Sequence, residues 1–464
     1  MPESEEFLSR CDKLGILIWQ DFFMHSNVYP DYDDEFVKEI LDESEEIVVN
    51  ARRHTCLSIL CGGNEQLEGW EEWGWSFDME RFYGRIILDK LHGLADRVCP
   101  DLPYVDNSPH GGRYSQSPIE GDCHNWGSYF NAFKDPLFVT ETCWTHESYS
   151  RPETLKKYMD IDVDDFYGKG WFEKFSELTS LQPQNRQPYS NWFNRKDLRS
   201  YLVSVEMEQM RADYSALSIL RMRSPSNRGI VYWSFNKGGP LFQFGCVDYG
   251  GYPMMSYYVV RRLYAPVVVV VYRDVEDVHV MLSNESGCEF NGFVELIHMN
   301  AKGDELQKIE FSVSAEDGSR MRLLSLMDKY KEVVDRSREA FVTRLRDGVG
   351  NVISEDILYS CPFSEFRQEN VDINAELSPC GRELTLSCDS VMQMVALESN
   401  HKILCSDNYF PLIPGESKII KIELIDKTCD EATVLQINSH TDSDVINLQT
   451  VRLDKTPKIV VANV

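Results

Sequence analysis

The sequence predicts a multidomain protein in which an α/β domain precedes all-β domains. Three observations support this class. The chain has 464 residues, which is too long for one ordinary core. Short apolar runs alternate with longer amphipathic stretches up to about residue 263, as in parallel α/β folds, and closely spaced short strands follow. Hydrophobic residues make up 42% and charged residues 26%, a balance that permits a buried core.

The first part of the chain is expected to contain parallel strands connected by helices. The expected strands are 15–22, 57–61, 102–106, 122–126, 137–141 and 229–235. Between the first two, apolar side chains recur at helical spacing from Phe36 to Ala51, with acids on the other face, which predicts one βαβ unit. Further helices are expected at 83–94, 153–159 and 198–222. The segment 160–197 is irregular and rich in Trp, Pro, Asn and Gln, which is typical of a loop at a binding site.

After about residue 263 two groups of short strands are expected. The first group is 267–272, 278–283, 292–298, 306–313, 340–346 and 356–359. The second is 383–386, 392–399, 418–424, 434–439 and 446–452, and it follows a polar stretch near 365–375. Each group would make one β-sandwich. The predicted domains are therefore 1–263, 264–366 and 367–464.

Charge and composition narrow the range of partners and cofactors. A net charge of −28 argues against nucleic acid and anionic membranes as partners, because both would repel this chain. The longest apolar run, near 267–271, is too short to span a bilayer, and the acidic start does not resemble a signal peptide. We therefore expect a soluble protein, with a cytoplasmic location favoured over export.

Metal and nucleophile motifs are also missing from the sequence. The 13 cysteines form no CxxC pair and no Cys/His cluster, so we expect free thiols and neither zinc nor a disulfide framework. There is no HExxH and no GxSxG, which sets aside a metal-dependent hydrolase and a Ser/His/Asp esterase. We expect no metal and no organic cofactor.

Two glutamates stand at the ends of predicted strands. Glu65 follows the run 57–61 through Gly62, Gly63 and Asn64, and Glu141 ends the run 137–141. The C-terminal ends of parallel strands converge, so both carboxylates can meet there. Retaining glycosidases need such a pair about 5–5.5 Å apart. Against this, any one of 75 acidic residues is far more often a solvated surface charge than a catalyst.

Several motifs then point to one family. Residues 11–22 read CDKLGILIWQDF, residues 62–65 GGNE, residues 107–109 NSP, and residues 121–127 GDCHNWG. Later, residues 138–141 read FVTE, residues 231–236 VYWSFN, and residues 406–416 SDNYFPLIPGE. These segments closely resemble motifs of glycoside hydrolase family 2 β-mannosidases, and they occur in that family's order along nearly the whole chain.

The resemblance implies a fold and a role for each residue. The fold would be a (β/α)8 TIM barrel, entered at about its third strand and so incomplete at its N-terminus, followed by two immunoglobulin-like β-sandwich domains. Glu65 would be the acid/base and Glu141 the nucleophile, and Asn64 would hydrogen-bond the sugar 2-hydroxyl. The glycone pocket would be lined by Trp19, Asp122, His124, Trp126 and Trp233.

For these lining residues simpler interpretations exist. A histidine such as His124 can be a satisfied core or loop side chain, and a lone Trp is more often core than sugar platform. The nearby acids Asp21, Glu68 and Glu147 are expected behind the site or on the surface.

The implied reaction is the removal of terminal non-reducing β-D-mannose from β-mannoside oligosaccharides or glycans, with retention. Related family 2 activities are alternatives, namely β-galactosidase, β-glucuronidase, exo-β-glucosaminidase and endo-β-mannosidase. A different class of alternative is a non-catalytic or vestigial carbohydrate-binding fragment. A partner chain that supplies the missing barrel strands is a further expectation of the incomplete barrel.

Overall fold

The computed structural model describes residues 3–126, 136–143, 148–160, 198–223, 227–240, 243–273, 277–369, 372–399, 402–425, 436–442 and 448–454. The chain divides into two compact units. Unit 1 comprises Met1–Thr142 and Ser226–Tyr232, and unit 2 comprises Cys143–Pro225 and Trp233–Val464. Each unit is described by itself.

Unit 1 is an α/β unit whose described residues form two small sheets of three strands each. One sheet has the order β1 (Ile18–Asp21), β2 (Leu57–Cys61) and β3 (Tyr104–Val105), with parallel pairing throughout. The other has the order β4 (Cys123–Trp126), β5 (Val139–Cys143) and β6 (Ile230–Tyr232), with β5 and β6 parallel. Its helices are α1 (Glu5–Leu14), α2 (Asp34–Ala51), α3 (Gln66–Glu71), α4 (Trp75–Asp78) and α5 (Arg85–Val98).

The helices of unit 1 begin and end at recognisable signals. The Asp33 side chain caps α2 by accepting hydrogen bonds from the backbone N–H groups of Glu35 and Phe36. Helix α1 begins after Ser4, whose side chain accepts from the N–H of Phe7, and ends at Gly15 in the left-handed region, with φ of 69°. Because Gly15 ends this helix, β1 begins later than the expected strand 15–22.

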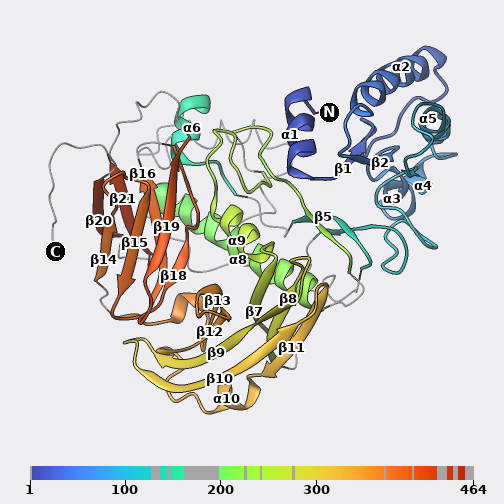
Figure 1. The fold of residues 1–464 in the computed structure, drawn as a ribbon. Helices are drawn as coiled ribbons and strands as arrows, with labels where there is room; N and C mark the ends of the chain where they lie inside the picture. Colours follow the sequence, from blue (N-terminus) through green and yellow to red (C-terminus); the bar gives the residue numbers. More distant parts are fainter. Residues whose placement is uncertain are drawn as a thin grey trace. The chain divides into compact units, whose positions relative to one another are not determined.

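One hydrophobic core holds unit 1 together. Helices α2 and α5 contact each other beside β1 and β2 (Figure 1). Their apolar faces, including Val48 and Leu91, are fully buried with Leu60 of β2 and Met24. Burial of this kind contributes about 1.5–3 kcal/mol for each large apolar side chain. The core therefore fixes the strand ends from which the candidate site projects.

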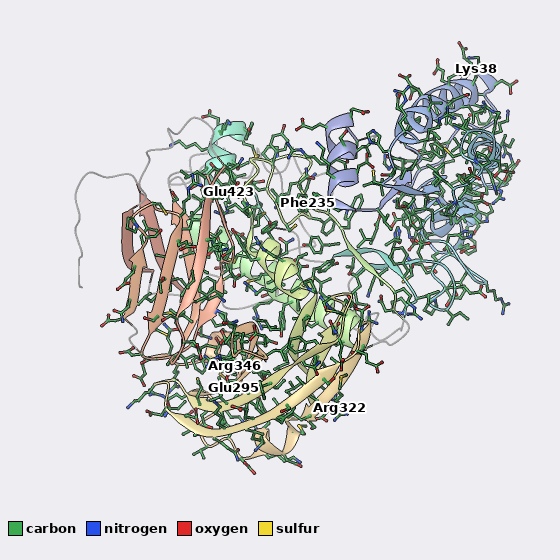
Figure 2. All side chains as sticks on the ribbon, in the orientation of Figure 1. Lys38, Phe235, Glu295, Arg322, Arg346 and Glu423 are labelled. Carbon is green, nitrogen blue, oxygen red and sulfur yellow. The ribbon has the colours of Figure 1, made fainter. Side chains whose placement is uncertain are left out.

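Unit 2 contains helices and two groups of β-strands. Its helices include α6 (Pro152–Met159), α8 (Leu198–Arg223), α9 (Met255–Leu263) and the short α10 (Met327–Lys331), with a 3-10 turn at Phe363–Glu365. In the first β-group a sheet of order β10-β9-β12-β13 is packed on one of order β11-β8-β7. These strands are β7 (Val267–Arg273), β8 (Val278–Asn284), β9 (Phe290–Asn300), β10 (Glu305–Ala315), β11 (Ser319–Ser325), β12 (Glu339–Asp347) and β13 (Val352–Tyr359). Arg346 and Glu295 form an ion pair of 2.7 Å across β12 and β9 (Figure 2).

The second β-group also consists of two sheets. Their orders are β14-β15-β19-β17 and β18-β16-β21-β20, and β16 pairs with β21 in parallel (Figure 1). The strands are β14 (Ile373–Leu377), β15 (Glu383–Cys388), β16 (Met392–Ser399), β17 (Ile403–Cys405), β18 (Phe410–Leu412), β19 (Lys418–Leu424), β20 (Gln436–Asp442) and β21 (Leu448–Asp454).

A hydrophobic seam joins the two β-groups. Along β9 alternate side chains point to opposite faces. Val294 and Leu296 belong to the core of the first group, whereas Ile297 and Met299 belong to a second cluster that includes Val391 and Ile413 of the second group. The seam is therefore built from both groups of strands.

The expected order of elements agrees with the described structure, with several omissions. The expectation of α/β followed by β-sheets is confirmed, and strand 57–61 coincides with β2. Helices α1, α3, α4, α9 and α10, the 3-10 turn and strands β11, β14, β17 and β18 were not expected. Strand β14 begins at Ile373, inside the stretch near 365–375 that was interpreted as a polar connection. The TIM barrel and the three domain boundaries stay predictions, and the expected loop 160–197 lies outside the described residues except for Asp160.

The described residues bear on the expectations for membrane helices and for cysteines. Within these ranges no helix combines the length and apolar character that a membrane crossing requires. The free cysteines of the described part include the buried Cys11, Cys56, Cys61 and Cys99.

Candidate active site

Glu65 stands on a tight turn directly after β2. Gly62 and Gly63 open the turn because a side chain would collide there: a Cβ on Gly62 would lie 2.3 Å from the Asp106 carbonyl oxygen. Glu65 itself has a left-handed backbone, with φ of 60°, and precedes α3. A non-glycine residue in this region costs about 1–3 kcal/mol and is held only where its surroundings fix it.

The segment from Asn107 to Pro109 fixes this turn. The Glu65 N–H donates to the Ser108 carbonyl at 2.7 Å, and the Ser108 N–H donates to the Gly63 carbonyl at 2.9 Å. The Asn107 side chain donates to the same Gly63 oxygen at 2.6 Å and accepts from the Leu67 N–H at 2.9 Å. These bonds hold the strained turn and so aim the Glu65 carboxylate.

One buried histidine brings the two predicted carboxylates together. His124, on β4, has a side chain that is 0% exposed, and its Nδ1 lies 2.8 Å from Glu65 Oε1. The same Nδ1 lies 3.4 Å from Oε2 of Glu141, on β5. The Glu141 side chain is only 9% exposed. The ends of different strands thus place both glutamates at one imidazole nitrogen.

A second layer of polar side chains stands behind His124. Its Nε2 lies 3.0 Å from Ser108 Oγ, which is 2.7 Å from Asp122 Oδ2. Thr140 Oγ1 also donates to Asp122 Oδ2 at 2.5 Å, and the His110 N–H donates to Asp122 Oδ1 at 2.8 Å. Both Asp122 oxygens and both His124 nitrogens therefore have partners within the protein.

Burial and crowding of acids shift the pKa values of the site. Burial raises the pKa of Glu141 to about 8 against the opposing charge of His124, and the charges of Glu65 and Asp21 add to the rise. Burial would lower the pKa of His124, but the hydrogen bond to Glu65 and the charge of Glu141 outweigh burial and raise it. Burial also raises the pKa of Asp21 and of Glu68. Glu141 therefore keeps, near neutral pH, a proton that an isolated carboxyl group would lose.

The remaining predicted site residues differ in how they are placed. Asn64 donates its N–H to the Met24 carbonyl at 2.7 Å, and its side-chain Oδ1 is buried without a hydrogen-bond partner among the described residues. Trp19, on β1, donates from its indole nitrogen to Asp21 Oδ1 at 2.7 Å, and its ring centre is 6.1 Å from that of Phe138.

Two predicted tryptophans and one acid are less fully described. The backbone of Trp126 belongs to β4, but its side chain lies outside the described part. Trp233 follows β6, belongs to unit 2 and is 45% exposed. Glu147 lies outside the described residues.

Sequence reasoning assigned no role to Ser108 or Thr140. Ser108 lies in the NSP segment and Thr140 directly precedes Glu141, so both stood within motifs already singled out. Nothing in the sequence indicates that both hydroxyls contact Asp122. Asp21 and Glu68 were expected near the site. Their charges contribute to the raised pKa of Glu141.

Within the described ranges one group of side chains is close enough to share a metal ion. One ligand atom from each of Glu65, Glu68 and His124 lies within 4.8 Å of the others. Both ring nitrogens of His124 are already in hydrogen bonds, however, so hydrogen bonding accounts for this closeness. We therefore do not identify the group as a metal site.

Comparison with known proteins places the chain. An immunoglobulin-fold domain model of mannosidases, Ig_mannosidase, matches residues 367–442. Over 90% of its length the chain is 23% identical to "Beta-mannosidase B" of Aspergillus niger, of which it covers 54%. It is 22% identical over 92% of its length to "Probable beta-mannosidase" of Caenorhabditis elegans, of which it covers 53%.

Solved structures resemble the same part of the chain. The β-D-mannosidase of Dictyoglomus thermophilum matches 91% of this chain with a TM-score of 0.79 and 22% identity, and 53% of that chain is covered. An exo-chitosanase from Amycolatopsis orientalis matches 90% with a TM-score of 0.59 and 14% identity, and 56% of it is covered. The chain thus spans about half the length of the relatives it matches. The immunoglobulin-fold match and these relatives together support a β-mannosidase-like protein of glycoside hydrolase family 2.

Proposed function

We propose that this chain carries the catalytic carboxylates of a retaining glycosidase that removes terminal non-reducing β-D-mannose from β-mannosides. The meeting of Glu65 and Glu141 at His124 Nδ1 carries the proposal. Contacts of 2.8 and 3.4 Å to one atom mean that the two oxygens are no farther apart than the sum, 6.2 Å. Carboxyl groups are about 5–5.5 Å apart in retaining enzymes and about 6.5–9.5 Å apart in inverting ones. The geometry favours retention.

The proposed reaction has two steps. Glu65 donates a proton to the leaving oxygen while Glu141 attacks the anomeric carbon and forms a glycosyl ester. Glu65 then takes a proton from the water that hydrolyses the ester. Because burial raises the pKa of Glu141 to about 8, the site keeps a proton near neutral pH. The reaction requires that proton to be off Glu141 when the glycoside is attacked, since a protonated carboxyl is a poor nucleophile.

The proposed sugar contacts follow from unsatisfied or partly exposed groups. The buried Asn64 Oδ1 lacks a partner among the described side chains, and a sugar 2-hydroxyl would satisfy it. Trp19 is partly exposed and offers an aromatic face for the C–H surface of a pyranose. Asp122, His124, Trp126 and Trp233 remain predicted pocket residues. The parallel pairings in unit 1, among β1, β2 and β3 and between β5 and β6, are compatible with parts of a (β/α)8 barrel.

Mannose as the sugar is supported by the named relatives. Two curated relatives and one solved structure are called β-mannosidases, whereas the more distant exo-chitosanase acts on a different glycan. The chain covers 54% of the Aspergillus protein, so activity of the chain by itself is part of the proposal.

The test is release of p-nitrophenol from the β-mannoside, compared with the β-galactoside, β-glucosaminide and β-glucuronide. We expect turnover of the mannoside that is lost in Glu141→Gln and kept in Glu43→Gln, a control at an exposed glutamate of α2. Proton NMR of the first product should show the β-anomer.

A non-catalytic carbohydrate-binding protein is the second candidate. It predicts that a folded sample binds mannosides without turnover, and this result would refute the proposed activity of the chain. An α-anomer as first product would instead refute retention and, with it, Glu141 as the nucleophile.

A further inference from the structure

The protons of the polar cluster behind Glu65 can be counted one by one. The cluster consists of Asp122, Ser108, His124 and Thr140, all in unit 1. A serine hydroxyl has one proton to donate, an ionised carboxylate only accepts, and a neutral imidazole has one donor and one acceptor nitrogen. These rules decide which nitrogen of His124 carries a proton.

Asp122 accepts hydrogen bonds from two hydroxyl groups. Its Oδ2 is 2.7 Å from Ser108 Oγ and 2.5 Å from Thr140 Oγ1, and as a carboxylate it can only accept from both. The single Ser108 proton is therefore used on Asp122. Two neighbours of Ser108 Oγ remain, Thr140 Oγ1 at 3.3 Å, whose own proton goes to Asp122, and His124 Nε2 at 3.0 Å. Ser108 has no further proton to donate, so it accepts from Nε2, which must carry the hydrogen.

The tautomer of His124 determines where the proton between Nδ1 and the Glu65 carboxyl group lies. With Nε2 protonated, Nδ1 either has the lone pair of a neutral ring or carries the second hydrogen of an imidazolium. In the first case Glu65 Oε1, 2.8 Å away, must carry the proton of that hydrogen bond; in the second case Nδ1 carries it. Either way one proton lies on the line between Nδ1 and the Glu65 carboxyl.

We propose that Asp122 and Ser108 are positioning residues that, through His124, keep the donor proton of the reaction in contact with Glu65. This inference rests on the proposed function of Glu65 as acid/base. In the glycosylation step the bond between the anomeric carbon and the leaving oxygen breaks, and that oxygen takes the shared proton through Glu65. Water returns one proton to Glu65 in the second step, so the count closes without any other reactant.

Several acidic side chains surround the His124 ring. The ring faces the carboxyl groups of Glu65, Glu141 and Asp122. Asp21 and Glu68 also contribute to the field at Glu141. In such acidic surroundings the other neutral tautomer would place its proton on Nδ1, toward the glutamates, and would turn a bare Nε2 lone pair toward Ser108. The Asp122–Ser108 pair prevents this, since Ser108 can only accept.

The test variant is Ser108→Ala, which removes the hydroxyl but keeps the backbone groups that bond Gly63 and Glu65. The matched control is Ser115→Ala, because Ser115 is also buried and its hydroxyl has no partner among the described residues. The conservative variant is Ser108→Thr, which keeps a hydroxyl.

General acid catalysis contributes about 100- to 10,000-fold, so we expect Ser108→Ala to lower kcat at least about tenfold. KM should change less than about threefold, and the alkaline limb of the kcat–pH profile should move to lower pH. Ser108→Thr should restore most of the rate and Ser115→Ala should match the parent. An unchanged kcat and pH profile in Ser108→Ala, or an equal loss in Ser115→Ala, would overturn the proposal.

A readout without turnover separates this inference from the proposed function. In ¹⁵N NMR of the histidine rings, the His124 signals, assigned by their loss in His124→Gln, should show Nε2 protonated in the parent. Ser108→Ala should weaken that preference. If the parent shows Nδ1 alone protonated, the proposed role of Asp122 and Ser108 is refuted whether or not the chain hydrolyses mannosides. If the parent shows the expected tautomer without turnover, only the proposed function fails.

Discussion

Glu141→Gln should make the protein more stable at neutral pH while it removes the proposed nucleophile. Glu141 is buried, and its pKa is raised from 4.5 to about 8, chiefly by burial. Between these two pH values the unfolded chain has lost a proton that the folded protein still binds, so stability falls as the pH rises. Gln resembles the protonated carboxyl in shape and does not titrate.

The magnitude follows from the pKa difference. Each pH unit above the ordinary pKa costs about 1.4 kcal/mol, so roughly 4 kcal/mol is the upper limit at about pH 7.5. Because the charge of His124 is coupled to that of Glu141, we expect a gain of about 2–4 kcal/mol. For a unit of this size the gain corresponds to a rise in Tm of roughly 5–10 °C. At about pH 5 the gain should fall below about 1 kcal/mol.

The assay is differential scanning calorimetry of the parent, Glu141→Gln and Glu43→Gln at both pH values. The exposed Glu43 of α2 controls for loss of one negative charge in a chain whose net charge is −28. Equal stability of the parent and Glu141→Gln at about pH 7.5, or a gain of the same size at about pH 5, would refute the argument. A gain shared by Glu43→Gln would show that net charge, and not burial, is the cause.

Three further predictions concern the core, the first helix and metals. Leu91→Ala, at a fully buried position of α5, should cost about 2–5 kcal/mol in chemical denaturation; a loss below about 1 kcal/mol would contradict the described core. His54 has a pKa raised by its hydrogen bonds to Asp12 and Glu5 of α1, so its contribution is present at low pH and lost as the pH rises through the raised pKa. His54→Gln should therefore lower Tm more near pH 5.5 than near pH 9, and equal losses would exclude this link. Exhaustive dialysis against EDTA should leave mannosidase turnover unchanged, whereas a loss restored by a divalent ion would point to Glu65, Glu68 and His124 as ligands.

The placement of Glu65 and Glu141 at strand ends could be predicted because local patterns mark it. An apolar run followed by Gly62 and Gly63 predicts where β2 ends, and the residue after such a strand faces the edge where parallel strands converge. The same holds for Glu141 on β5, although the strand continues to Cys143. These features depend on residues close together in the chain.

The contacts around His124 could not be predicted in this way. His124 contacts Glu65 across 59 positions of sequence and Ser108 across 16. Such contacts depend on how three strand ends and one loop are placed, which periodicity does not encode. Short elements were missed for a related reason: the three residues of β17 are too few for an alternating pattern to stand out.

The start of helix α1 is marked by a signal in the sequence. Ser4 followed by Glu5 and Glu6 is a typical helix start, with a capping side chain and acids in the first turn. The structure gives this helix a defined role, because Asp12 accepts from the Cys56 N–H at 2.8 Å and so ties the helix to the residues before β2.

The hydrophobic seam along β9 limits how far the β-groups can be exchanged as modules. The immunoglobulin-fold match begins at residue 367, which suggests a part that could be cut out and grafted elsewhere. Yet Val391 and Ile413 of that part are buried against Ile297 and Met299 of the other group. Excision would expose an apolar face on both pieces, and such faces promote aggregation. Recombination in this lineage should therefore tolerate exchange of the two β-groups as a pair far better than exchange of the last one alone.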